Sequence, residues 1–114
     1  MGIEGGGYLV NPEAEKGRVE AVVKAAIDLG IYVIIDWHDH NAESHLEEAT
    51  EFFNEMAQRY GGYPNVLFEV FNEPMLQRWE DAIKPYHESL VAVIRQHTDN
   101  LIILGTRFWS QAVH

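Results

Sequence analysis

Three short runs of β-branched and aromatic residues constrain the fold of this 114-residue chain more than any other feature. They lie at residues 31–35, 66–71 and 101–105. Continuous apolar runs of this length are typical of strands that are buried on both faces of a parallel sheet. Apolar residues recur at three- and four-residue spacing ahead of each run, which predicts a helix before every strand. This alternation predicts a parallel α/β sheet with right-handed crossovers and its helices outside.

The ends of the expected helices are also marked in the sequence. Asn11 suits the cap of the first helix and Gly30 its carboxyl end. Ser44 and Glu47 have the spacing of a capping box ahead of the second helix. Pro85 falls inside the third helical stripe, where we expect it within the first turns or at a kink.

Composition and charge exclude several classes of function. Hydrophobic residues make up 46% of the chain and charged residues 23%, as in soluble globular proteins. Eight Lys and Arg against 18 Asp and Glu give a net charge of −10 at pH 7, so neither nucleic acid nor a membrane surface is an expected partner. The chain has no cysteine, which excludes a disulfide framework, a thiolate zinc site and a cysteine nucleophile. The amino-terminal segment does not have the pattern of a signal peptide.

Three parallel strands can form a small open sheet or part of a closed barrel, which needs roughly 200 residues or more. In both architectures the active site lies beyond the carboxyl ends of the strands. The predicted strands lead into three groups of reactive side chains, Asp36-Trp37-His38, Asn72-Glu73-Pro74 and Trp109-Ser110-Gln111. The edge of the sheet that they share is therefore the predicted site.

Glu73 is the strongest candidate for chemistry. A carboxylic acid at a strand end, flanked by Asn72 and Pro74, suits a general acid whose pKa is raised by a shielded setting. The alternative is a glutamate that stabilises the start of the following helix. Asn72 could bind a substrate hydroxyl or hold its own turn.

Glu69 is the nearest carboxylate that could form a catalytic pair with Glu73. The two residues are about 13 Å apart along an extended strand. Retaining and inverting glycosidases separate their carboxylates by about 5–5.5 Å and 6.5–9.5 Å. The two are therefore not a catalytic pair, and Glu69 is expected to face the sheet interior, where a buried carboxylate needs a partner such as Arg or His.

The other candidates each have a structural alternative. His38 could act at the site or be a satisfied core histidine. Trp109 could stack on a sugar ring or cap the core, and Arg107 could orient a carboxylate or be a solvated loop charge. His38 and His40 lie among aspartates, but no recognisable ligand motif accompanies them, so we expect no metal.

Taken together, residues 31–38, 65–74 and 101–111 resemble glycoside hydrolase family five, most closely its bacterial-type endo-β-1,4-glucanases, which are cellulases. The resemblance implies a partial (β/α)₈ TIM barrel, in which three parallel strands alternating with helices are the third to fifth of the barrel. Residues 1–114 would then be a central fragment of the catalytic barrel. It also implies a secreted enzyme that hydrolyses β-1,4-glucosidic bonds of cellulose or related β-glucan with retention and without a cofactor.

The resemblance assigns roles to four residues. Glu73 matches the catalytic acid/base of the family, and Asn72 matches the neighbour that contacts the 2-hydroxyl. His38 matches a histidine at the cleavage subsite, and Trp109 lies in a loop that borders the substrate groove. The family nucleophile ends the seventh strand and has no counterpart in this chain, so the chain alone is expected to be inactive.

Two other functions stay open at this point. A β-mannanase of the same family would share the strand-end motifs, because its substrate choice depends on loops. A non-catalytic carbohydrate-binding or half-barrel assembly module would associate through exposed strand edges and faces.

Overall fold

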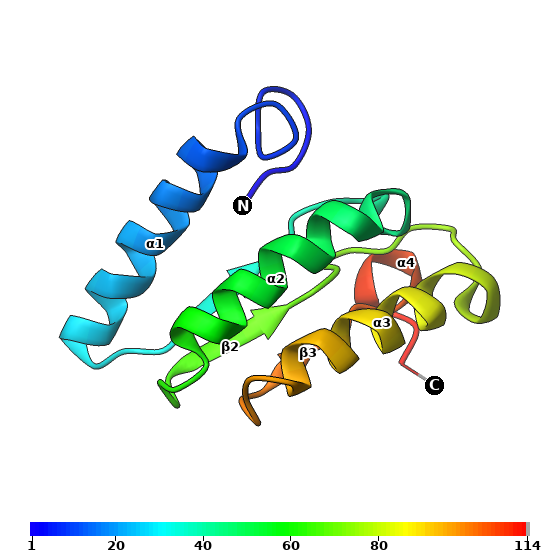
Figure 1. Cartoon of the computed structure of the whole chain (residues 1–114). Coiled ribbons are helices and arrows are strands. Elements are labelled where there is room, and N and C mark those ends of the chain that lie inside the picture. Colours follow the sequence, from blue (N-terminus) through cyan, green and yellow to red (C-terminus); the bar gives the residue numbers. More distant parts are fainter. Residues whose placement is uncertain (114) are drawn as a thin grey trace.

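The structure is a computed structural model, and it describes residues 1–113. Three parallel strands form one sheet in the order β1-β2-β3, which are Val33–Asp36, Val66–Glu69 and Ile102–Ile103. Each strand follows a helix, and these are α1 (Pro12–Leu29), α2 (Leu46–Tyr60) and α3 (Lys84–Arg95). The predicted alternation of helices and parallel strands is confirmed (Figure 1).

Two helix ends form as predicted. The Asn11 side chain accepts a hydrogen bond from the Ala14 backbone N–H at 3.4 Å, at the start of α1. Gly30 ends this helix in the left-handed conformation, with φ 69°, and its N–H bonds to the carbonyls of the last turn. Glycine adopts this conformation without the steric penalty that a Cβ would bring.

The second helix does not begin as predicted. A 3₁₀ turn, η1 (Ala42–His45), precedes α2, and no side chain caps either element. Ser44 lies inside this turn, so the capping-box prediction is wrong. Ala42 is fully buried and His45 contacts Asp39 at 2.7 Å, and these two anchors hold the chain in a tight turn where the cap was expected.

The third helix begins through a wider turn. A π-helical segment, η2 (Trp79–Ile83), leads directly into α3, and Pro85 occupies the first turn of α3. A proline ring inside a helix clashes with the carbonyl four residues earlier, and an i→i+5 turn relieves this crowding. Pro85 therefore lies within the first turns, as the sequence predicted.

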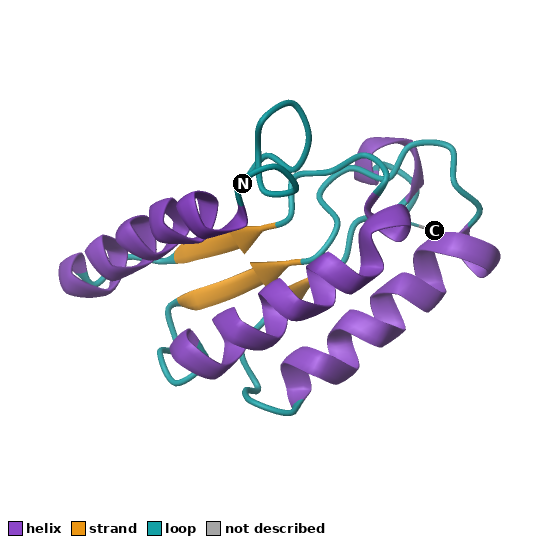
Figure 2. Ribbon diagram, turned by 45° about the horizontal axis from the view of Figure 1, so that its top comes forward, coloured by secondary structure: helices purple, strands orange, loops and turns teal. Residues whose placement is uncertain are grey.

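The main core lies between the sheet and the helices. Helices α2 and α3 lie side by side over one face of the sheet, and α1 lies beside β1 (Figure 2). On this outer face Ile35 and Phe68 are 1% and 0% exposed. Aromatic rings of α2 and the strands pack edge to face, as Phe53 does on Phe68 with centroids 6.4 Å apart. Such packing stabilises the sheet on its helix side.

The inner face of the sheet is much less covered. Ile34 is 49% exposed, and Leu67 and Ile103 are half-buried. Asp36 and Glu69 are register partners on the same face. The prediction that the strands are buried on both faces is therefore correct for the outer face only, because all three long helices lie on that side.

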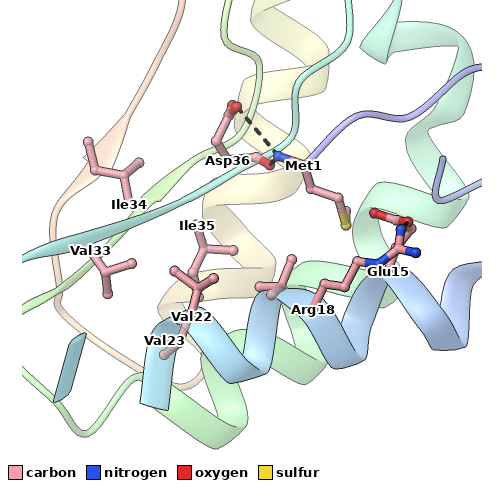
Figure 3. A pocket seen from close by; sticks show the side chains of 10 residues that line it. Met1, Glu15, Arg18, Val22, Val23, Val33, Ile34, Ile35 and Asp36 are labelled. Carbon is pink, nitrogen blue, oxygen red and sulfur yellow. Dashed lines mark hydrogen bonds and ion pairs between the residues drawn. The ribbon is translucent and has the colours of Figure 1, made fainter. Parts of the chain in front are cut away.

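A groove of about 260 Å³ runs between α1 and the edge strand β1. Val33 and Ile35 point toward α1, whereas Ile34 and Asp36 point to the other side of the strand (Figure 3). The amino group of Met1 lies 3.8 Å from the Asp36 carboxylate. The alternation of side chains along β1 thus separates an apolar, helix-facing row from a row that carries charge.

No helix within residues 1–113 has the length and apolar character of a membrane span.

Candidate active site

The loops that follow the three strands meet at one edge of the sheet, as predicted. Asn72, after β2, accepts a hydrogen bond from the Asp39 backbone N–H, after β1, at 3.0 Å. Its own carbonyl accepts from the Ser110 hydroxyl, after β3, at 2.9 Å. The Trp109 N–H donates to the Pro74 carbonyl, also at 2.9 Å. All three strand-end motifs are therefore bonded to one another.

Gly105 makes this convergence possible. A Cβ built at Gly105 would lie 2.1 Å from the Phe71 carbonyl oxygen and 2.7 Å from the Pro74 ring. No side chain fits at such distances, so only glycine lets the end of β3 approach the turn that holds Glu73. The sequence identified Gly105 as a strand end, and the close approach is a property of the assembled sheet.

Glu73 lies in the loop after β2, with its side chain 46% exposed. Its carboxylate is 3.5 Å from His40 Nε2. The next helical segment begins only at Trp79, so Glu73 is not a helix-start residue and that alternative is wrong. The shielded setting expected for a general acid is not provided within residues 1–113, because the helices cover only the opposite face of the sheet.

Asn72 is 8% exposed and is fixed in orientation. Its Oδ1 accepts a hydrogen bond from the Asp39 N–H, so its NH₂ group is free to donate a hydrogen bond to a ligand. The alternative of an asparagine that holds its own turn is wrong, because its side chain bonds a residue 33 positions away. The amide is thus held by one edge while the other edge stays available.

His38 is not a core histidine, because its side chain is 59% exposed. Its Nδ1 lies 3.1 Å from Asp36 Oδ2, which holds the ring by one edge. Burial raises the pKa of Asp36, and the Met1 amino group and His38 act in the opposite direction. Burial, with the neighbouring Asp36 charge, also raises the pKa of Glu69. No ion pair joins Glu69 to any residue of the described chain, so the partner that the sequence analysis expected is not found there.

Trp109 is 46% exposed, so it does not cap the core. It belongs to the short helical segment α4 (Arg107–Ser110), in which Phe108, Trp109 and Ser110 all have positive φ. Backbone of this kind is strained for residues with a Cβ. The Trp109 backbone is bonded to the Glu73 turn through Pro74, and its side chain lies at the surface.

Arg107 is not the solvated loop charge that was one of its two predicted roles. Its guanidinium lies 4.9 Å over the Phe108 ring, and its NH₂ group donates to the Leu76 carbonyl at 3.4 Å. Arg107 is half-buried, which excludes a freely solvated charge, and no carboxylate is its partner among residues 1–113. It packs the loop after β3 against the loop after β2.

Asp39, which no motif in the sequence singles out, is 5% exposed. Its carboxylate contacts Trp37 Nε1 at 3.2 Å, Asn41 N at 2.8 Å and His45 Nδ1 at 2.7 Å. The polar run in which it lies has the pattern of a solvated loop. The one available signal was the neighbouring Trp37, whose indole N–H needs an acceptor if it is buried.

No group of three or more potential metal ligands comes together within the part of the chain that the structure describes.

Comparisons with known proteins agree with this geometry. Residues 3–114 match the family described as Cellulase (glycosyl hydrolase family 5). Endoglucanase Z of Dickeya dadantii is 51% identical in an alignment that covers 99% of this chain and 27% of that protein. A solved structure from Cytophaga hutchinsonii matches with a TM-score of 0.95 and 50% identity, over 97% of this chain and 37% of that one. The catalytic domain of Thermobifida fusca endoglucanase Cel5A matches with a TM-score of 0.91 and 41% identity, over 96% and 37%.

The chain spans about a quarter of the length of the curated relatives it matches. Its three strands and their helices superimpose on part of the TIM barrel of these enzymes, so the predicted fold class is confirmed. The family match covers nearly the whole chain, and about half of the positions are identical in an endoglucanase. By fold, by strand-end motifs and by sequence, this chain belongs to glycosyl hydrolase family 5, the cellulase family.

Proposed function

We propose that this chain forms the acid/base side of the active site in a retaining endo-β-1,4-glucanase, with Glu73 as the acid/base. The main support is the turn after β2, where the partly exposed Glu73 carboxyl stands beside the fixed amide of Asn72. The relatives are named as endoglucanases, and a variant of the Thermobifida fusca domain is known in complex with cellotetraose. β-1,4-Glucan is therefore the proposed substrate, in preference to β-mannan.

Retaining hydrolysis needs two carboxyl groups about 5–5.5 Å apart. Glu73 would protonate the departing glycosidic oxygen and would later take a proton from the water that cleaves the glycosyl-enzyme. Asp36 and Glu69 are the last residues of β1 and β2. Glu69 is too far from Glu73 along the extended chain to be its catalytic partner. We therefore assign the nucleophile to a strand outside this chain, which makes residues 1–114 a central fragment of the catalytic barrel.

Three further residues would bind the sugar. The free NH₂ edge of Asn72 can donate to a sugar hydroxyl next to the cleaved bond. His38 is held through Nδ1, which leaves its Nε2 edge for a second hydroxyl. The exposed Trp109 ring offers an apolar face on which a pyranose ring can stack.

An insoluble glucan chain cannot enter a cell, so the proposed site of action is extracellular.

A chimera tests this proposal. Residues 3–114 would replace the matching segment of Dickeya dadantii endoglucanase Z, which supplies the remaining strands. We expect the chimera to hydrolyse carboxymethyl cellulose faster than mannan, and the 114-residue chain alone to be inactive. In the chimera, Glu73→Gln should lower kcat/KM by about 10²–10⁴-fold, the usual contribution of a general acid/base. Glu48→Gln, on the exposed side of α2, is the matched control and should have no effect.

Two outcomes would contradict the proposal. Full activity of the Glu73→Gln chimera would exclude Glu73 as the acid/base. The exposed inner face of the sheet favours the assembly module as the alternative. A defined oligomer of the chain alone that retains cello-oligosaccharides, together with an inactive chimera, would support that alternative.

A further inference from the structure

The loop after β1 contains a buried carboxylate that the proposed chemistry does not use. Asp39 is 5% exposed, and its Oδ1 accepts the Asn41 backbone N–H at 2.8 Å. Its Oδ2 is shared by the Trp37 indole N–H at 3.2 Å and by His45 Nδ1 at 2.7 Å. A buried carboxylate is tolerated only when donors surround it, and here three donors from both sides of the loop do so.

These bonds fix the backbone of Asp39, and that backbone fixes Asn72. The Asp39 N–H donates to Asn72 Oδ1 at 3.0 Å. If the Asn72 amide were rotated by half a turn, its NH₂ group would face the Asp39 N–H, which places two donors against each other. The position of Asp39 therefore selects the amide orientation in which the NH₂ group is free for a ligand.

The same loop also reaches the residue after Asn72. His40 Nε2 lies 3.5 Å from the Glu73 carboxylate. Gln77 ties this loop to the chain that follows Glu73, because its NH₂ group donates to the His40 carbonyl at 2.6 Å and to the Glu43 carboxylate at 3.0 Å. The loop thus contacts both members of the Asn72-Glu73 pair, and the carboxylate at its base is well placed to control their positions.

We propose that Asp39, held by His45, is a positioning residue that acts through Asn72. The Asp39–His45 contact sets the loop, the loop presents the Asp39 N–H, and this N–H orients the Asn72 amide toward the sugar hydroxyl. The role of Asn72 toward sugar rests on the proposed function. The contacts that lead from His45 through Asp39 to Asn72 are independent of the proposed function.

The structural part is tested in the 114-residue chain by NMR. In the parent chain we expect the Asp39 N–H to exchange with solvent at least about 10²-fold more slowly than a free amide. His45→Ala should reduce this protection at least tenfold and should broaden or shift the Asn72 NH₂ signals. His45→Gln, which can still donate to Asp39, should restore both. Ser44→Ala, a neighbour whose side chain is outside the network, is the matched control. Unchanged protection and unchanged Asn72 signals in His45→Ala would overturn the proposal.

The link to sugar binding is tested in the endoglucanase Z chimera by a double-mutant cycle. Asp39→Ala should lower kcat/KM about tenfold or more. The same substitution in the Asn72→Ala background should lower it by less than about threefold, because the residue through which it acts is already gone. Equal losses in both backgrounds would mean a merely structural role and would overturn the proposal. If the chimera itself is inactive, the proposed function fails while the NMR result still decides whether Asp39 positions Asn72.

Discussion

The two faces of the sheet are formed by alternate residues of the same strands, and they differ sharply. Ile35 and Phe68 on the outer face are 1% and 0% exposed, whereas Ile34 on the inner face is 49% exposed. The outer face packs its apolar side chains against the helices, whereas the inner face carries Asp36 and Glu69 side by side. One face therefore stabilises the fold, and this leaves the other free to present charged groups in the direction of the site.

The largest expected effect comes from shortening one side chain on each side of the sheet and comparing the two losses of stability. Phe53 on α2 is fully buried and packs on Phe52 and Phe68, with ring centroids 5.2 and 6.4 Å away. Phe53→Ala should lower the free energy of unfolding by about 3–5 kcal/mol. Ile34→Ala on the inner face should lower it by less than about 1 kcal/mol, because half of that side chain is already in water. Urea unfolding of the 114-residue chain measures both, and similar losses would show that the inner face is also packed.

The two faces should also respond to pH in opposite directions. On the helix side, His87 packs edge to face on Phe71 and Trp79, and both of its ring nitrogens are buried without a partner in the described chain. Burial lowers the pKa of His87 from 6.5 to about 4. The folded state thus favours the neutral ring, so its stability is complete above about pH 6.5 and is lost as the pH falls toward 4. The difference between the two pKa values corresponds to roughly 3 kcal/mol over this interval.

This prediction is checked by urea unfolding at about pH 7.5 and about pH 5. The parent chain should lose stability between the two, whereas His87→Leu, which cannot be charged, should lose distinctly less. His87→Leu also retains an apolar side chain of similar size against Phe71 and Trp79. An equal loss in the parent and the variant would assign the acid sensitivity to other groups.

The type and order of the elements could be predicted from the sequence, but the extents of the strands could not. The run at residues 101–105 forms a strand only at Ile102–Ile103. Its ladder with β2 contains only the pairs Phe68–Ile102 and Glu69–Ile103. Strand length depends on the neighbouring strand as well as on local preference, and the chain beside an edge strand is not visible in the pattern of that strand.

In the candidate site, too, some features could be predicted from the sequence and others could not. Asn72, Glu73 and Trp109 could be placed at one edge because parallel strands all end on the same side of a sheet. The polar run itself does not show that Asp39 is buried, and the one hint is the neighbouring Trp37, whose indole N–H needs an acceptor when it is buried. Its partners come from an indole on one side and His45 on the other, and the chain brings them together only when η1 forms.

The smallest effect concerns the acidic pair on the inner face. Burial and the Asp36 charge raise the pKa of Glu69, so stability from this group is present at low pH and is lost as the pH rises through its folded pKa. Like charges directly opposite each other in a sheet are destabilising, typically by up to about 1 kcal/mol. In the 114-residue chain, Glu69→Gln should therefore raise the thermal midpoint at about pH 7, and this gain should shrink as the pH falls through the raised pKa of Glu69, because the parent carboxyl then takes up a proton. Glu48→Gln, on the exposed side of α2, should change neither value. A Glu69→Gln chain that is less stable than the parent at neutral pH would mean that Glu69 already has a favourable partner on this face, which would remove the contrast between the two sides of the sheet.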